Sequence, residues 1–298
     1  MLSDLITYID SLNVNDGRHF MKTFELIIDG EKRKLVLEYL SEKTKSLYRL
    51  DSVEEYLKQH GDDLNVLDPS GVLDYIKENT LPEEDPGNKQ KHLSDARNEM
   101  AEVLGMLFLQ EELDVKFPYP KLAQKDNRSG AAGGIDSFGI VYNSSDDDFK
   151  IVINETKCSS SKKNPPGVVH SGEESLYKTL KSAKNIDNRF GYEITKVIRV
   201  AKDENYKKLA YRIINYIVNE KEIDLKDHIL VVPFMVRQSE FWDKKDYGKF
   251  NEAENDFQDV DLEFYICSVN ENLNRFAEDL YGSIGFDIKD DEEGEEDN

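Results

Sequence analysis

Apolar residues recur at helical or strand spacing along most of the chain, and short polar segments separate these stretches. The N-terminal part contains one short helical pattern, two strand-like apolar runs and two amphipathic helical stretches, at residues 4–12, 24–28, 34–37, 53–60 and 70–78. Asp29-Gly30 lies between the two apolar runs and favours a tight hairpin turn. We therefore predict a small α+β region over residues 1–85.

The remainder of the chain alternates helical and strand-like patterns. A polar segment with two prolines, residues 81–88, precedes it. A long helix is expected from about Ser94, and it is apolar on more than one side, as in a helix packed between other elements. Further helices are expected at residues 171–183, 206–218 and 273–281, and strands at residues 134–142, 149–156, 194–200, 228–236 and 262–269. This order predicts an α/β domain over residues 92–285, with helices on the faces of a mixed sheet.

Polar residues interrupt two of the predicted strands where a buried strand should be apolar. Asp136 follows two glycines and an isoleucine, and Glu155-Thr156-Lys157 ends a run of Ile and Val. Residues two positions apart in a strand share a face, so Glu155 and Lys157 point together and Thr156 points away. The simpler interpretation is a strand end with solvated or salt-bridged charges.

Two carboxylates and a lysine on neighbouring strands can form a metal site for phosphodiester hydrolysis. Such a reaction needs a divalent cation, which polarises the phosphate and makes hydroxide from water near neutral pH. Asp136 and Glu155 would be metal ligands, with the Thr156 carbonyl as a further one. Lys157 would orient the attacking water or stabilise the transition state. The pattern therefore indicates Mg²⁺ or Mn²⁺ as the cofactor.

The spacing from Asp136 to Glu155-x-Lys157 resembles the core of the PD-(D/E)xK nucleases, the superfamily of the restriction endonucleases. The resemblance implies an α/β fold with a mixed-sheet, restriction-endonuclease-like core and flanking helices. In this superfamily a helix before the first core strand often adds a glutamate to the metal site. Glu102 is the better match for that catalytic and metal-binding role, with Glu99 in reserve, and the helical wheel does not choose between them.

A closer resemblance covers residues 95–280 and is to the HamA family, the nuclease subunits of the bacterial Hachiman antiphage defence system. It rests on residues 97–102, Lys121-Leu122, Gly134-Ile135-Asp136 and Glu155-Thr156-Lys157. Ala101 and Asn154 stand where the family pattern favours glycine, and neither change removes a catalytic group. The resemblance implies DNA degradation during phage infection. It also implies a superfamily 2 helicase partner, HamB, that loads on DNA and restrains the nuclease until it is triggered.

Composition indicates in which cellular compartment the protein functions. The 298 residues are 38% hydrophobic, which is enough for a packed core. No apolar run approaches the roughly 18–20 residues that span a bilayer, and residues 1–6 do not resemble a secretory signal. The two cysteines, Cys158 and Cys267, are too few and too distant for a disulfide framework. We therefore expect a cytoplasmic protein without membrane contact.

The net charge of −22 argues against strong DNA binding by the chain alone, because phosphate contacts favour basic proteins. Residues 287–298 hold eight acidic residues and one lysine, which account for −7 of this charge and leave −15. We expect residues 286–298 to form a disordered acidic tail. DNA would then be delivered by the helicase partner.

Several polar or basic residues near the predicted catalytic strands are further candidates for contact with nucleic acid, although each is more simply a solvated side chain. They are Lys121, Lys125, residues 159–163, Ser175, Tyr177, Lys178 and Lys181. Two other functions stay open. The chain can be a catalytically degenerate nuclease fold that acts as an interaction or inhibitory subunit, or a nuclease directed at RNA with the same core chemistry.

Overall fold

The computed structural model describes residues 1–14, 17–63, 65–66, 68–82, 89–119, 121–124, 135–143, 148–185, 188–219 and 225–285. The predicted acidic tail and Lys125 lie outside these ranges. Within them, every helix is too short or too polar to cross a membrane. Cys158 and Cys267 are buried and not joined to each other.

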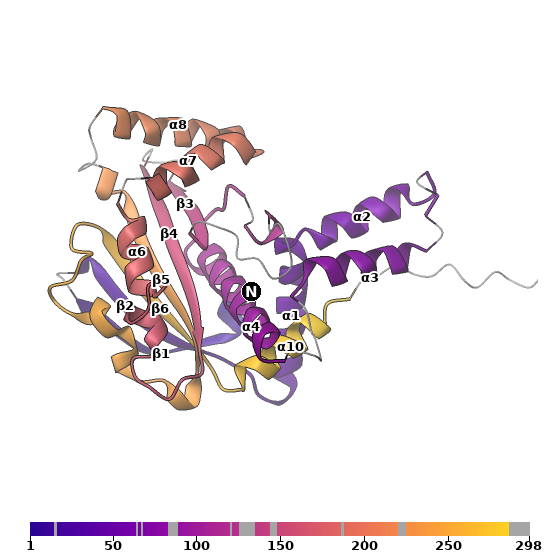
Figure 1. Cartoon of the computed structure of the whole chain (residues 1–298), viewed down its shortest axis with the longest axis horizontal. Coiled ribbons are helices and arrows are strands. Elements are labelled where there is room, and N and C mark those ends of the chain that lie inside the picture. The colour runs from indigo at the N-terminus through magenta and orange to yellow at the C-terminus, as the bar shows by residue number, and fades with distance from the viewer. Residues whose placement is uncertain are drawn as a thin grey trace, which may run out of the picture.

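A six-stranded mixed sheet forms the centre of the molecule, with the strand order β1-β2-β6-β5-β4-β3 (Figure 1). The strands are β1 (Ile6–Val14), β2 (His19–Leu26), β3 (Ser137–Asn143), β4 (Asp148–Ser159), β5 (Ile229–Gln238) and β6 (Asp261–Val269). The four central strands run parallel, whereas β1 and β3 pair antiparallel at the two edges. β5 is buried along nearly its whole length, as expected for a parallel strand that is covered on both faces.

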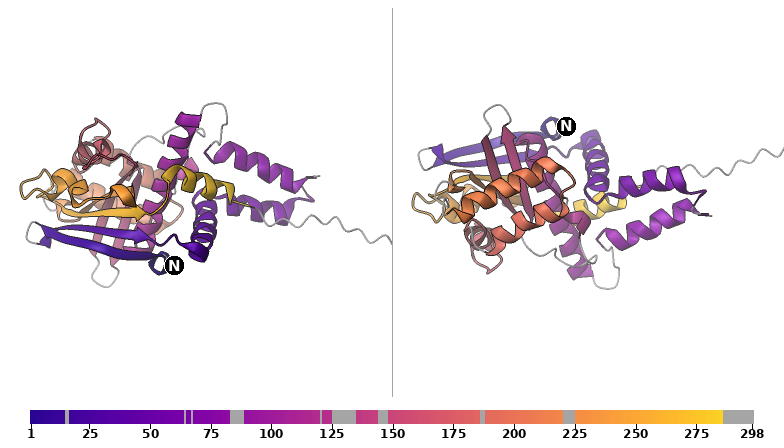
Figure 2. Two further views of the ribbon diagram at one scale, coloured as in Figure 1. Left: turned by 90° about the horizontal axis from the view of Figure 1, so that it is seen from below. Right: turned by 90° about the horizontal axis from the view of Figure 1, so that it is seen from above.

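Helices cover both faces of the sheet. On one face, α1 (Gly30–Leu47), α4 (Lys89–Glu112) and α10 (Leu273–Gly282) share a core with β2, β5 and β6. On the other, α5 (Gly167–His170), α6 (Leu176–Ala183), α7 (Asn188–Val200) and α8 (Glu204–Val218) enclose a second core. α2 (Leu50–His60) and α3 (Pro69–Thr80) lie side by side and project away from the sheet (Figure 2). The predicted α/β class, with a mixed sheet and flanking helices, is confirmed and is compatible with a restriction-endonuclease-like core.

The close approach of α4 to the sheet depends on Gly105. A Cβ atom at this position would lie 2.8 Å from Thr156 Oγ1 and 3.3 Å from a ring carbon of Phe234. The flanking apolar residues of α4, from Val103 to Leu109, are buried on all sides of the helix. The prediction that this helix packs between other elements is therefore confirmed. The helix begins at Lys89, earlier than the predicted start near Ser94.

Two predictions for the N-terminal region are wrong. Residues 4–12, predicted as a helix, lie mostly in β1, an edge strand whose Ile and Thr residues suit an extended backbone. Residues 34–37, predicted as a hairpin strand, belong to α1, because Asp29 and Gly30 start that helix instead of making a turn. Short apolar runs do not distinguish a strand from a buried helix. Since β1 and β2 join the central sheet, the N-terminal region contributes to the same layer as the strands that carry the site.

The predicted strand at residues 194–200 is also wrong. This segment belongs to α7, which buries Phe190, Ile194 and Val197 against the second core at helical spacing. Its β-branched residues resemble a strand when the segment is considered without the preceding turn. The other predicted helices and strands of the domain are found, with shifted ends.

Candidate active site

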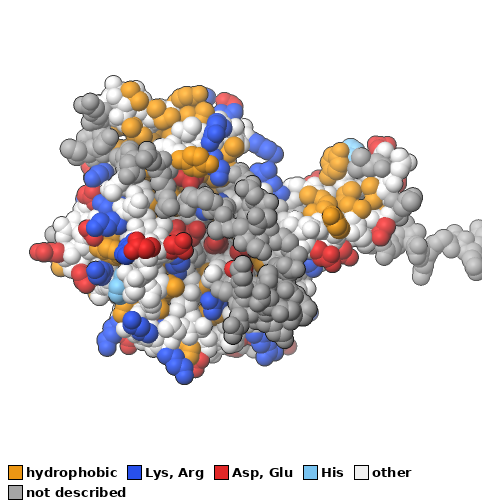
Figure 3. Space-filling model, viewed as in Figure 1, with side chains coloured by type: hydrophobic (Ala, Val, Ile, Leu, Met, Phe, Trp, Pro, Cys, Tyr) orange, Lys and Arg blue, Asp and Glu red, His pale blue; other side chains and the backbone are white. Residues whose placement is uncertain are grey.

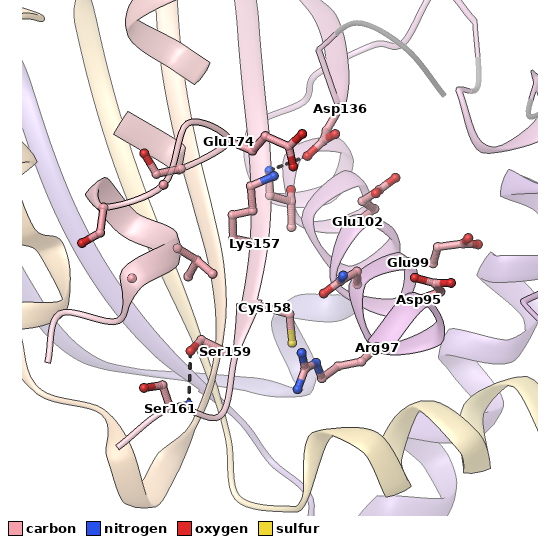
Figure 4. Close-up of a pocket in the computed structure, with 17 residues that line it drawn as sticks. Asp95, Arg97, Glu99, Glu102, Asp136, Lys157, Cys158, Ser159, Ser161 and Glu174 are labelled. Carbon is pink, nitrogen blue, oxygen red and sulfur yellow. Dashed lines mark hydrogen bonds between the residues drawn. The ribbon is translucent and has the colours of Figure 1, made fainter. Parts of the chain in front are cut away.

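The polar residues at the ends of β3 and β4 meet at an open edge of the sheet. β3 begins at Ser137, opposite Asn154, so among the described strands the last residues of β4 pair with β5 only. Asp136 directly precedes β3. A cleft of about 800 Å³ opens at this point between α4, the end of β4 and the segment before α6 (Figure 4).

Asp136 is held by the backbone of β4 and by Lys121. Its Oδ2 accepts a hydrogen bond of 2.9 Å from the Thr156 amide, and its Oδ1 lies 3.6 Å from Lys121 Nζ. The same ammonium donates to the Ile135 carbonyl at 2.5 Å. Lys121 is buried, so it supports Asp136 and is not placed as the contact to a DNA phosphate that the sequence suggested.

Glu193 supports the same segment from α7. Its Oε1 accepts a hydrogen bond of 3.4 Å from the Ile135 amide, and its Oε2 accepts one from the Tyr119 hydroxyl. Burial and the Glu193 carboxylate raise the pKa of Tyr119. Sequence reasoning missed Glu193 because it lies in a helix partly mistaken for a strand, and no local pattern connects it with Asp136.

The buried Glu155 and the partly exposed Lys157 form an ion pair next to Asp136. Lys157 Nζ donates to Glu155 Oε1 at 2.7 Å, and Glu155 Oε2 is buried without a hydrogen-bond partner. Burial and the Asp136 carboxylate raise the pKa of Glu155 to about 7. Burial alone would lower the pKa of Lys157, but the Glu155 and Asp136 carboxylates raise it, so the ammonium stays charged. The structure thus brings together the two carboxylates and the lysine that the sequence singled out.

The Thr156 side chain points away from Glu155 and Lys157, as predicted. Its Oγ1 lies close to Gly105 of α4 and donates to Asn154 Oδ1 at 3.2 Å. Asn154 donates in turn to the Val232 carbonyl at 2.8 Å, so its side chain is used within the sheet. The N–H and C=O of one strand residue point to the same side. Because the Thr156 amide faces Asp136, its carbonyl also points toward the open edge.

Two glutamates of α4, one turn apart, have different surroundings. Glu99 is buried and accepts a hydrogen bond from the Tyr48 hydroxyl, and burial together with its charge raises the pKa of Tyr281. Both glutamates line the cleft, but of the two only Glu102 is among the charges that raise the pKa of Lys157. Figure 4 shows Glu102 on α4 between Glu99 and Asp136. Of the two, Glu102 lies on the side of the catalytic candidates.

The oxygen donors at this edge suit a hard divalent cation. Asp136 and Glu155 offer carboxylates, and the unpartnered Glu155 Oε2 is a buried acceptor that a cation would satisfy. Mg²⁺ is often held by only one or two carboxylates and keeps several waters. In the described part of the chain, no three His, Cys, Asp or Glu side chains are arranged to hold a metal ion together. Metal ligation by Glu102 therefore stays a prediction.

The other candidates are distributed unevenly around the cleft. Ser159 and Ser161 line it, and so does Ser175, whose hydroxyl is buried without a partner. The remaining candidates of α6 pair elsewhere: Tyr177 and Lys181 with Asp256, and Lys178 with Glu173. Arg97 also lines the cleft, and sequence reasoning assigned it no role of its own.

Comparison with known proteins agrees with the resemblance seen in the sequence. The family model described as HamA matches residues 4–284, and the chain therefore belongs to the HamA family. The match extends beyond residues 95–280 and includes the N-terminal region. Membership gives the chain a role in Hachiman antiphage defence. A search of the curated proteins finds no match.

Proposed function

We propose that this member of the HamA family is a metal-dependent nuclease that hydrolyses phosphodiester bonds in DNA and is controlled by a partner helicase. The observation that carries the proposal is the grouping of Asp136, Glu155 and Lys157 at the open end of β4. A charge cluster with only a structural role is expected to satisfy its buried oxygens. Glu155 Oε2 is left without a partner, and the next two residues, Thr156 and Lys157, line the cleft.

The residues of the site have separable tasks. Asp136 and Glu155 would hold Mg²⁺ or Mn²⁺, with the Thr156 carbonyl beside them and Glu102 on the facing wall. When bound, such a cation polarises the phosphate and lowers the pKa of water. Lys157 is anchored by Glu155 at 2.7 Å and stays cationic, so it can orient the water or stabilise the developing negative charge.

The acidic cleft and the negative net charge of the chain support the proposal that a partner delivers the DNA. Among the described residues, five carboxylates line the cleft, from Asp95, Glu99, Glu102, Asp136 and Glu174, together with two cationic side chains. On the face in Figure 3, basic side chains are interspersed with acidic ones and do not form a continuous stripe. A chain with a net charge of −22 gains little from phosphate contacts on its own. A helicase that loads on DNA in the cytoplasm would supply what this surface lacks.

Cleavage of plasmid DNA tests the proposal. The full chain is incubated with its helicase partner, ATP and Mg²⁺, and supercoiled plasmid is expected to become nicked or degraded. Glu155→Ala and Lys157→Ala should abolish cleavage, whereas Arg275→Ala, at an exposed position of α10, should not. Full cleavage by both site variants would contradict the catalytic assignment. An RNA of the same sequence, tested in parallel, shows which nucleic acid is preferred.

One observation favours the alternative of a catalytically degenerate subunit. Among the described residues, no group of three ligands is arranged for a metal ion. Calorimetry with Mn²⁺ separates the two functions. A nuclease should bind Mn²⁺, and Glu155→Gln should weaken that binding. A degenerate subunit should bind no Mn²⁺ and still associate with the helicase.

A further inference from the structure

Of the two cations among the described residues that line the cleft, Arg97 is the one without a described carboxylate partner. Apart from Arg97, the described residues lining the cleft include one cation, Lys157, and Lys157 is paired with Glu155. No ion pair joins Arg97 to any described carboxylate. Asp95 lies nearby on the same helix and lines the same cleft, but residues two apart on a helix do not face each other.

The Arg97 guanidinium has unused hydrogen-bond donors. It extends from α4 toward the end of β4 (Figure 4), where Nη1 donates to Ser160 Oγ at 3.3 Å. Its Nε is buried and has no acceptor. Arginine carries five N–H donors in a fixed planar arrangement, and a buried donor without an acceptor is unfavourable. The arrangement therefore favours a ligand that brings acceptor oxygens to this end of the cleft.

The loop that faces Arg97 is fixed from the protein interior. Arg237 is fully buried and donates hydrogen bonds to four oxygen acceptors of residues 159–164. It also pairs with Asp246 at 2.9 Å. Ser159 and Ser161 are thus presented to the cleft by a segment that is ordered before any ligand binds, which lowers the entropic cost of binding.

We propose that Arg97 and the hydroxyls of residues 159–161 form a second subsite, which binds a backbone phosphate next to the one that is cut. A guanidinium matches the geometry of phosphate oxygens, and serine hydroxyls are suitable additional donors. The subsite lies in the same cleft as Asp136 and Lys157, so one nucleic-acid strand can occupy both. This inference rests on the proposed nuclease function, and it identifies how an acidic cleft holds an anionic polymer.

Salt-dependent binding tests the subsite. A fluorescent single-stranded oligonucleotide is titrated, in Mg²⁺ and from low salt upward, into the full chain carrying Glu155→Gln to prevent cleavage. Adding Arg97→Gln should weaken binding about tenfold. It should also reduce the slope of log affinity against log salt by about 0.7, the value for one phosphate contact on a single strand. Arg97→Lys should keep the slope and lose part of the affinity.

Arg275→Gln is the matched control, because it removes the same charge from an exposed position of α10. If Arg97→Gln and Arg275→Gln give the same affinity and slope, the subsite is wrong, even where Glu155→Ala abolishes cleavage and the proposed function stands. If Arg97→Gln does not fold, the affinity of Arg97→Lys decides, because lysine lacks the planar guanidinium and full affinity would contradict a guanidinium–phosphate contact.

Cleavage kinetics of the helicase complex give a second readout. In an otherwise unchanged chain, Arg97→Gln should raise KM for the nucleic acid about tenfold and change kcat by less than about twofold. A fall in kcat at constant KM would show that Arg97 acts on the chemical step or on folding, and would overturn the subsite.

Discussion

Two ion pairs near the end of β4 differ in how many hydrogen bonds their cations make and in whether they open to the cleft. Arg237 and Asp246 are both 0% exposed, and Arg237 donates hydrogen bonds to six oxygen acceptors. The pair of Glu155 and Lys157 opens to the cleft through Lys157, and Glu155 keeps one oxygen without a partner. Burial next to Asp136 also raises the pKa of Glu155 to about 7.

The difference separates a structural role from a functional one. Both pairs bury charge, which is costly unless the charges find partners. The burial of Arg237 is compensated by hydrogen bonds within the protein, which join β5 to the loop at residues 159–164. Glu155 and Asp136 are held close together in spite of their repulsion, and such arrangements are typical of functional sites. One oxygen of Asp246 also has no partner, so the unpartnered oxygen alone does not distinguish the two pairs. The distinction is that Lys157 lines the cleft, whereas neither Arg237 nor Asp246 does.

The largest effect is expected for Glu155→Gln. Glutamine keeps the shape of the side chain and removes the carboxylate, so cleavage by the helicase complex should fall by at least about 10²-fold. The free energy of unfolding should change by less than about 1 kcal/mol, because the lost charge was itself destabilised by burial and by Asp136. Denaturant unfolding of the metal-free chain measures this change. If Glu155→Gln instead lowers the free energy of unfolding by several kcal/mol, the Glu155–Lys157 pair has a structural role and does not differ from the Arg237–Asp246 pair.

For Arg237→Met we expect a large loss of stability, in contrast to the small change expected for Glu155→Gln. It leaves Asp246 buried without its cation and frees the loop after β4, so unfolding should become easier by about 3–5 kcal/mol. Arg275→Met, at an exposed position, should change stability by less than about 0.5 kcal/mol. Combining Arg237→Met with Asp246→Leu should recover part of the loss, since no unpaired charge remains. Equal stability of the Arg237 and Arg275 variants would show that Arg237 does not fix the loop.

A smaller contrast is expected between the two glutamates of α4. Glu99→Ala leaves the buried Tyr48 hydroxyl without its acceptor and should cost about 1–3 kcal/mol of stability. Glu102→Ala should leave stability within about 0.5 kcal/mol of the original and reduce cleavage, because the Glu102 charge acts on Lys157 and that of Glu99 does not. Paired measurements of unfolding and plasmid cleavage distinguish them. If Glu99→Ala reduces cleavage more than Glu102→Ala at equal stability, the assignment of the helix glutamate is reversed.

The sequence predicted the part of the site that is local in the chain. Glu155 and Lys157 are two residues apart on one strand, and Asp136 lies at the start of the strand that pairs with it. The supporting residues depend on contacts between distant segments. Glu193 reaches Ile135 from α7, and Arg237 holds a loop that lies far from it in the sequence. No spacing rule connects such residues, so their roles required the fold.

The same distinction explains the errors in the fold. Long, strongly patterned elements such as α4 and β5 were predictable because their burial is continuous. Residues 4–12, 34–37 and 194–200 are short apolar stretches, and their state is decided by what they pack against. β1 is a strand because it pairs with the edge of β2. α7 is a helix because the helical spacing of Phe190, Ile194 and Val197 lets all three pack into the second core.

The smallest effect is expected for Lys121→Met, which tests whether a supporting residue behaves like the structural pair or like the catalytic one. Methionine fills the buried space but removes the ammonium that lies 3.6 Å from Asp136 and donates to the Ile135 carbonyl. Cleavage should fall by about tenfold, as is usual when a residue that orients a ligand is lost. Stability should change by about 1 kcal/mol, the value of one hydrogen bond. Lys116→Met, at an exposed position, is the control, and Lys121→Arg should restore part of the activity. If Lys121→Met keeps full cleavage and loses several kcal/mol, Lys121 belongs with Arg237, and the catalytic group is limited to Asp136, Glu155 and Lys157.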